Sequence, residues 1–198
     1  MSDALPALYL ARHGETTWSL SGRHTGVTDI PLTERGARNA QRLRERLSGI
    51  GFAEVFTSPL QCAARTCELT GFGSIAEINH DLFEWDYGEY EGHRTADIDK
   101  ERPDWQLFRD GCPGGESPSA VGVRADRVVK RVRAVPGDVL VFFSAHFLRV
   151  LAARWLGREP AIGGCFVLST ASLSVLGYEH SLAAPVIRLW NDTRHLET

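Results

Sequence analysis

Short apolar runs alternate along the chain with amphipathic stretches. Continuous apolar runs at residues 7–11 and 138–143 predict two strands that are buried on both faces. From Thr33 to Leu47, apolar residues recur at three- and four-residue spacing opposite a face of arginine and glutamate. This spacing predicts an amphipathic helix that Thr33 caps and that ends before Gly49 and Gly51.

The order of strand and then helix returns further along the chain. Residues 54–57 predict a strand, and Ser58 with Pro59 predicts a helix that begins there and runs toward Leu69. Three more elements are expected: a helix at 146–156, and two strands at 172–179 and 185–190 that form a hairpin-like end to the sheet. The pattern is typical of an α/β fold in three layers, with helices on both faces of a mixed, mostly parallel sheet.

Length and composition bound the domain organisation. The chain has 198 residues, of which 43% are hydrophobic and 24% charged, enough for one domain with a core of its own. We therefore expect a single domain over residues 1–198. Residues 82–118 are too rich in Trp, Asp, Gly and Pro for one regular element, and we interpret this segment as a lid.

Charge and cysteine spacing exclude several classes of partner. A net charge of −3 argues against nucleic acid or an anionic membrane. No apolar run is long enough to span a bilayer and the N-terminus has no signal pattern, so a cytoplasmic protein is expected. The four cysteines have no C-x-x-C spacing, so neither a zinc site nor a redox role is expected, and the thiols should be reduced. No metal or other cofactor is expected. Whether the chain forms a homo-oligomer stays open.

An arginine and a histidine follow the first predicted strand. Arg12 offers a planar fork of donors that suits a phosphate group, and His13 has a ring nitrogen that can attack phosphorus. Right-handed crossovers would bring the ends of the strands before Arg12, Ser58 and Ser144 to one edge of the sheet. This edge is the predicted site, with His13 as candidate nucleophile.

Seven motifs extend this pattern over nearly the whole chain. They read RHGET (12–16), GRHTGVTD (22–29), PLTERG (31–36), TSPL (57–60), EWDYGEYEG (84–92), PGGES (113–117) and LWND (189–192). Together they resemble the phosphoglycerate-mutase-like branch of the histidine phosphatase superfamily. The resemblance implies a phosphohistidine on His13, Glu84 as general acid, and substrate contacts from Thr25, Gly26 and Tyr87. Apolar neighbours such as Trp85 would suit Glu84 to that role, because burial favours a protonated carboxyl group.

The first departure from the family pattern lies after the TSPL motif. Related sequences have an arginine that binds the phosphate where this chain has Cys62. Arg65 shares a helix face with that position and is expected as a substitute charge in the phosphate site. Alternatively, Arg65 pairs with a nearby acid and the site lacks one cation. Cys62 itself is either a reactive thiol near Arg12 or a buried structural one.

The second departure follows the strand at 138–143. An ungapped match places Ser144 on the family's second pocket histidine and Ala145 on the glycine after it. His146 matches a further histidine that only some members carry. Either His146 binds phosphate from a new position, with Ser144 beside it, or the site has lost one of its phosphate-holding groups.

Three functions remain in view. The first is a metal-independent phosphatase that hydrolyses a small phosphorylated metabolite, and the segment 82–92 looks particularly like phosphatases of sugar phosphates such as sedoheptulose bisphosphate. The second is an impaired pseudophosphatase that binds a phosphorylated ligand or performs altered chemistry, which Cys62 and Ser144 keep open. The third is a phosphoglycerate mutase, although the segment is shorter here than is typical of such mutases.

Overall fold

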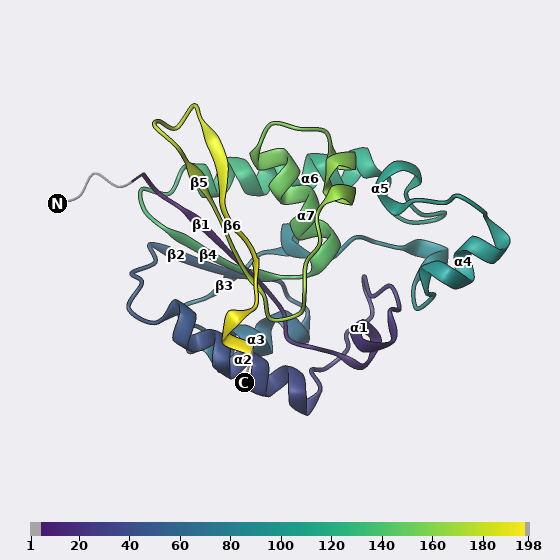
Figure 1. Ribbon diagram of the computed structural model, residues 1–198, viewed down its shortest axis with the longest axis horizontal. Coiled ribbons are helices and arrows are strands. Elements are labelled where there is room, and N and C mark those ends of the chain that lie inside the picture. The colour runs from purple at the N-terminus through teal and green to yellow at the C-terminus, as the bar shows by residue number, and fades with distance from the viewer. Residues whose placement is uncertain (1–4, 197–198) are drawn as a thin grey trace.

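The computed structural model describes residues 5–196 and is built around one six-stranded sheet (Figure 1). The strands, in chain order, are β1 (Leu8–Arg12), β2 (Glu54–Thr57), β3 (Glu77–Ile78), β4 (Val139–Phe143), β5 (Leu173–Tyr178) and β6 (Pro185–Asp192), and their order in space is β3-β2-β4-β1-β5-β6. The pairs β3–β2, β2–β4 and β4–β1 are parallel, whereas β1–β5 and β5–β6 are antiparallel. The predicted mixed, mostly parallel sheet and its C-terminal hairpin are confirmed.

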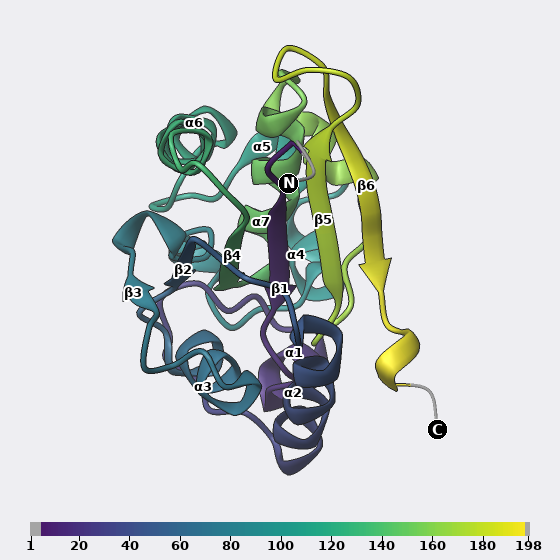
Figure 2. The same ribbon diagram turned by 90° about the vertical axis from the view of Figure 1, so that its left-hand side faces the viewer.

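Helices cover both faces of this sheet (Figure 2). They are α1 (Thr17–Ser21), α2 (Glu34–Leu47), α3 (Gln61–Thr70), α4 (Thr95–Glu101), α5 (Leu107–Asp110), α6 (Pro118–Arg133) and α7 (Ala145–Trp155), with short 3-10 helices η1 (His80–Leu82), η2 (Gly88–Tyr90), η3 (Pro160–Cys165) and η4 (Arg194–Leu196). On β4, Leu140 and Phe142 belong to the apolar cluster with α2 and α3, while Val141 and Phe143 belong to the cluster with α6 and α7. The central strand is therefore apolar throughout because alternate side chains enter two separate cores.

The starts of the helices show which local signals act. Thr33 caps α2 as expected, since its hydroxyl accepts a hydrogen bond from Gly36 N at 2.9 Å. The predicted start of α3 at Ser58 and Pro59 is wrong by a few residues. The Ser58 hydroxyl accepts from Leu60 N at 3.3 Å within a turn, and α3 begins at Gln61, whose N–H donates to Asp29 Oδ1 at 2.7 Å. A distant aspartate thus takes the capping position.

The segment 82–118 is a series of turns and short helices. Its first part belongs to the core, because Trp85 and Tyr87 are among the largest fully buried side chains. Its middle part contains α4 and α5 and contributes Thr95 to the pocket described below. Within residues 5–196, no helix has the length and apolar character needed to cross a membrane.

Candidate active site

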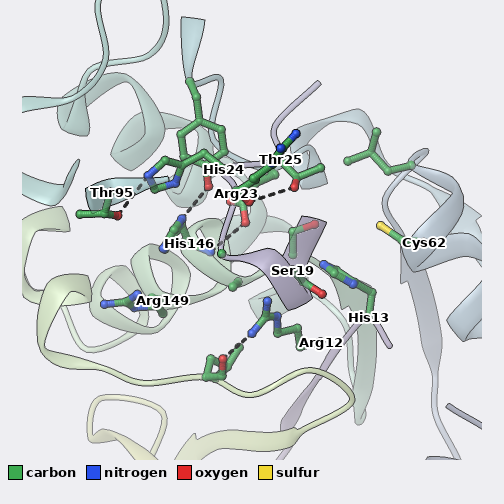
Figure 3. Close-up of a pocket in the computed structure, with 17 residues that line it drawn as sticks. Arg12, His13, Ser19, Arg23, His24, Thr25, Cys62, Thr95, His146 and Arg149 are labelled. Carbon is green, nitrogen blue, oxygen red and sulfur yellow. Dashed lines mark hydrogen bonds between the residues drawn. The ribbon is translucent and has the colours of Figure 1, made fainter. Parts of the chain in front are cut away.

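A pocket of about 270 Å³ opens at the carboxyl ends of β1 and β4 (Figure 3). This is the edge at which the sequence predicts the site. Eight of the residues singled out in the sequence line the pocket: Arg12, His13, Thr25, Cys62, Glu84, Tyr87, Ser144 and His146. Arg65 and Gly26 do not line it. The volume lies just below the range of about 300–1,000 Å³ of ligand sites, so a small ligand is favoured.

The orientation of His13 is fixed by its backbone and by one ring nitrogen. Its N–H donates to Phe143 O at 3.1 Å, which continues the register of β1 on β4. Nδ1 lies 2.7 Å from Gly14 O. Because a carbonyl oxygen only accepts, Nδ1 must carry the ring proton, which leaves the lone pair on Nε2. The ring is therefore held in the tautomer that a nucleophile at Nε2 requires.

Burial and Arg12 keep this imidazole neutral. His13 is buried, and desolvation, together with the positive charge of Arg12, lowers its pKa to about 3. Arg12 donates from Nη1 to Leu168 O at 2.5 Å, while its buried Nε has no hydrogen-bond partner among residues 5–196. A charged guanidinium with a free donor beside a neutral imidazole is an arrangement suited to a phosphoryl group.

Glycine is required at position 14 because the loop after β1 packs closely against the first turn of α2. A Cβ atom on Gly14 would lie 2.4 Å from Gly36 O, and one on Gly36 would lie 2.1 Å from Glu15 O. Gly14 N also donates to the Thr66 hydroxyl at 3.0 Å, which ties the loop to α3. The loop that follows Arg12 therefore packs against the start of α2, and each holds the other in place.

Glu84 lies against the N-terminus of α7. Its Oε1 accepts from Trp85 N at 2.8 Å and from Phe147 N at 2.7 Å, and its Oε2 accepts from His146 N at 2.9 Å. Burial raises the pKa of Glu84, and these backbone donors and Arg12 act against that rise. Oε2 has one backbone partner and Oε1 has two, so Oε2 is the oxygen left to carry a proton.

Arg124 on α6 fixes the backbone on either side of Glu84. Its guanidinium donates to Asp81 O at 3.0 Å and Glu84 O at 3.1 Å, and it also forms a salt bridge with Glu116 at 2.6 Å. The same group lies 4.3 Å from the ring centroid of Phe147. Arg124 is thus a structural residue that holds the candidate acid in place.

We expect Arg124→Met to lower the free energy of unfolding by about 3–5 kcal/mol, because it leaves Glu116 and the carbonyl groups of Asp81, Phe83 and Glu84 without their buried partner. Urea denaturation measures this change. Arg38→Met serves as a control, because its contact with Glu34 is long, at 3.8 Å, and solvent-exposed. Equal effects of the two substitutions would contradict the structural role of Arg124.

The placement of Arg65 differs from the expectation. Arg65 is exposed and its Nη1 donates to Glu68 Oε2 at 2.7 Å, away from the pocket lining. Of the two readings of the sequence, the geometry agrees with an arginine paired to a nearby acid. Cys62 does line the pocket, but burial raises the pKa of its thiol to about 12, which favours the buried structural thiol over the reactive one.

Gly26 has a packing role in the structure. Its N–H donates to both carboxylate oxygens of Glu91 at 3.0 Å. A Cβ atom there would lie 2.3 Å from Trp85 O, so only glycine fits. Its neighbour Thr25 does line the pocket, and its hydroxyl donates to Arg23 O at 3.2 Å.

Ser144 and His146 both reach the pocket from the start of α7. Ser144 is the buried residue that precedes the helix, and His146 is in its first turn. His146 Nδ1 lies 2.5 Å from Tyr87 Oη. Burial, then the charges of Arg149, His24 and Arg12, hold the pKa of His146 well below its usual range. A neutral imidazole therefore lies in the pocket two residues beyond the position where the family has its histidine.

One pocket residue that the sequence analysis missed is Arg149. Its Nε donates to Gly163 O at 2.8 Å and its Nη2 to Gly164 O at 3.1 Å, and its guanidinium lies 4.4 Å from the ring centroid of Phe108. Arg149 follows His146 by three residues, so helical spacing could have placed both on one face. Other missed lining residues are Ser19, Gly22, Arg23, His24, Leu60, Thr95, Ala145 and Leu168.

Metal ligands do not gather in this pocket. In the part of the chain that the structure describes, no group of three or more His, Cys, Asp or Glu side chains is placed to hold a metal ion. The cationic groups that line the pocket are the guanidinium groups of Arg12, Arg23 and Arg149.

Comparison with known proteins agrees with this fold and site. Residues 8–193 match the family model of the histidine phosphatase superfamily (branch 1), and the chain belongs to that family. It is 38% identical to an acid phosphatase of Mycobacterium tuberculosis, with 88% of each chain covered. It is 35% identical to the sedoheptulose 1,7-bisphosphatase of Saccharomyces cerevisiae, over 96% of this chain and 94% of that one. Both of these relatives are phosphatases.

The backbone agrees equally well with a solved structure. The open reading frame Rv3214 of Mycobacterium tuberculosis superposes with a TM-score of 0.89 at 36% identity, covering 94% of this chain and 97% of that chain. The family assignment made from the seven motifs is confirmed, and the phosphatase relatives support a phosphatase activity for this chain.

Proposed function

We propose that the protein is a metal-independent phosphatase that hydrolyses a small phosphorylated metabolite through a phosphohistidine intermediate. The observation that carries this proposal is the neutral His13 ring, whose Nδ1 is bonded to Gly14 O and whose Nε2 is free beside the charged Arg12. Nε2 attacks phosphorus, the bond from phosphorus to the ester oxygen breaks, and that oxygen leaves with its electron pair. Water then attacks the phosphohistidine, which releases phosphate and restores the imidazole.

Glu84 supplies the proton that the leaving oxygen needs. Burial favours its protonated form, and within residues 5–196 the one backbone partner of Oε2 is His146 N. Once ionised, the same carboxylate is stabilised by the three backbone N–H groups at the start of α7 and at Trp85. It can then accept a proton from the water that attacks the intermediate, so one group serves both half-reactions.

The size and charge of the pocket support a small, phosphorylated substrate. About 270 Å³ accommodates a small metabolite, and Arg23 and Arg149 add positive charge beyond that of Arg12. The likeness to a sedoheptulose 1,7-bisphosphatase supports a phosphorylated sugar as substrate. The stretch around Thr95 would cover such a ligand in the way expected of a lid.

The test of this function is hydrolysis by the purified protein in the presence of EDTA. We expect release of phosphate from an aryl phosphate and from sugar phosphates without added metal. If the protein binds inorganic phosphate but releases none from any of these esters, it is a binding protein, which is the alternative that Cys62 in the pocket favours. Activity that disappears with EDTA and returns with a metal ion would also overturn the proposal.

The role of Glu84 predicts a dependence on the leaving group. We expect Glu84→Gln to slow hydrolysis of an alkyl phosphate by about 10²- to 10⁴-fold, because a poor leaving group needs protonation in the transition state. Hydrolysis of p-nitrophenyl phosphate, which has a good leaving group, should fall far less. Glu89→Gln is the matched control, because Glu89 belongs to the same motif but is exposed and outside the pocket. An equal loss with both substrates would remove Glu84 from the role of acid.

A further inference from the structure

The contact between Tyr87 and His146 joins two elements that are distant in the sequence. Tyr87 precedes η2 and is fully buried, whereas His146 is in the first turn of α7. The phenol oxygen lies 2.5 Å from Nδ1 of the imidazole. The backbone of His146 is held as well, by its N–H donating to Glu84 Oε2 at 2.9 Å. The imidazole is therefore fixed at two points.

The hydrogen bonds available to each of the two groups identify the donor in this contact. If His146 donated its Nδ1 proton, the Tyr87 hydroxyl proton would need another acceptor, and no other hydrogen bond to this hydroxyl occurs within residues 5–196. If Tyr87 donates, one bond satisfies both the buried hydroxyl group and the partly buried ring nitrogen. The second arrangement avoids the cost of an unpaired buried hydroxyl, which is about 1–3 kcal/mol.

The charges around the pair agree with this direction. Burial, with Arg149, His24 and Arg12 nearby, lowers the pKa of His146, so the imidazole is neutral and carries one ring proton. Burial raises the pKa of Tyr87, so its hydroxyl keeps its proton. A protonated phenol that donates to a neutral imidazole leaves the single ring proton on the other nitrogen, Nε2.

We propose that Tyr87 sets the tautomer of His146, so that Nε2 carries the ring proton and donates it to an oxygen of the phosphoryl group in the pocket. Tyr87 is then a positioning residue, and His146 takes over the contact that the family's histidine at position 144 would make. In the opposite tautomer, the lone pair of Nε2 would face the phosphate oxygens and repel them. This inference rests on the proposed function for its phosphate ligand, but the tautomer itself is independent of turnover.

The test has a spectroscopic arm that needs no activity. Ring nitrogen chemical shifts of nitrogen-labelled histidine, assigned with His146→Gln, report which nitrogen of His146 carries the proton. We expect protonation at Nε2 in the wild type and a mixture of tautomers in Tyr87→Phe. Tyr90→Phe is the matched control, since Tyr90 lies on η2 nearby, packs on Trp105 and is outside the pocket. Protonation at Nδ1 in the wild type, or an unchanged tautomer in Tyr87→Phe, would overturn the assignment.

The second arm measures the affinity for inorganic phosphate by calorimetry. We expect Tyr87→Phe to weaken phosphate binding about tenfold, the effect of one hydrogen bond to a charged group, and Tyr90→Phe to leave it unchanged. Thermal unfolding of each variant confirms that it is folded. If the tautomer changes in Tyr87→Phe while phosphate affinity stays the same, the contact between His146 and phosphate is contradicted. Failure of the proposed function would instead show as absent hydrolysis with the wild-type tautomer intact.

Discussion

His13→Ala should lower the rate of phosphate-ester hydrolysis by about 10⁴- to 10⁶-fold, the range seen when a catalytic unit loses a member such as its nucleophile. The buried ring is neutral because its pKa is lowered to about 3, so Nε2 is available as a nucleophile at any pH well above that value. Among the described residues of the pocket, neither His146 nor His24 shows this contact with a carbonyl group, since His146 Nδ1 is bonded to Tyr87 and His24 Nε2 lies 3.3 Å from the Thr95 hydroxyl. Neither ring is therefore held as His13 is.

The control for this substitution is His180→Ala. The side chain of His180 is 84% exposed and lies outside the pocket, so its removal should leave the rate unchanged. Steady-state kinetics with an aryl phosphate measure both variants, and binding of inorganic phosphate shows that the His13→Ala pocket remains intact. A variant without His13 that retained wild-type hydrolysis would remove this residue from the mechanism.

Cys62→Arg should raise turnover by about 100- to 1000-fold, the effect of one preorganised donor on a transition-state oxyanion. Cys62 lies at the start of α3 on the pocket wall, and its neutral thiol offers no charge there. Arg65 does not replace that charge, because it is exposed and paired with Glu68. Ser144→His should add much less, since His146 already lies in that part of the pocket.

Two further variants test whether the Cys62 thiol or Arg65 contributes to turnover. Cys62→Ala should behave like the wild type if the thiol has no chemical role, and Arg65→Ala should also leave turnover unchanged. A large loss of activity in Arg65→Ala would show that the exposed arginine reaches the substrate. An absence of any gain in Cys62→Arg would show that another group, such as Arg149, already compensates for the family's arginine.

The layers of the fold could be predicted because the sheet and its main helices carry strong hydrophobic patterns. The strand β4 is apolar at every position since both of its faces are buried, and α2 has both its periodic face and its Thr33 cap in the sequence. The start of α3 could not be placed from Ser58 and Pro59, because a tertiary contact with Asp29 fixes it. Helix α6 is absent from the predicted elements although its sequence contains a Ser117 cap, Pro118 at the start, and apolar residues at helical spacing.

The site was predictable where residues are adjacent in sequence or follow a strand end. Arg12, His13 and His146 reach the same pocket for that reason. Elsewhere in the site, the sequence does not show in which direction a side chain points. Arg65 shares a helix face with Cys62 in sequence spacing, but a local partner, Glu68, holds it in solvent. The rise in the pKa of the Cys62 thiol also depends on burial, which the sequence does not display and which outweighs the lowering effect of the backbone hydrogen bonds at Cys62 and Ala63.

The central claim is that hydrolysis takes place in two displacements at phosphorus, with His13 as the first nucleophile. The most direct test is the stereochemical course with a phosphate monoester made chiral at phosphorus by oxygen isotopes. Each in-line displacement inverts the configuration, so transfer to His13 followed by transfer to water should give overall retention. Overall inversion would mean that water attacks the substrate directly, which would contradict the phosphohistidine intermediate.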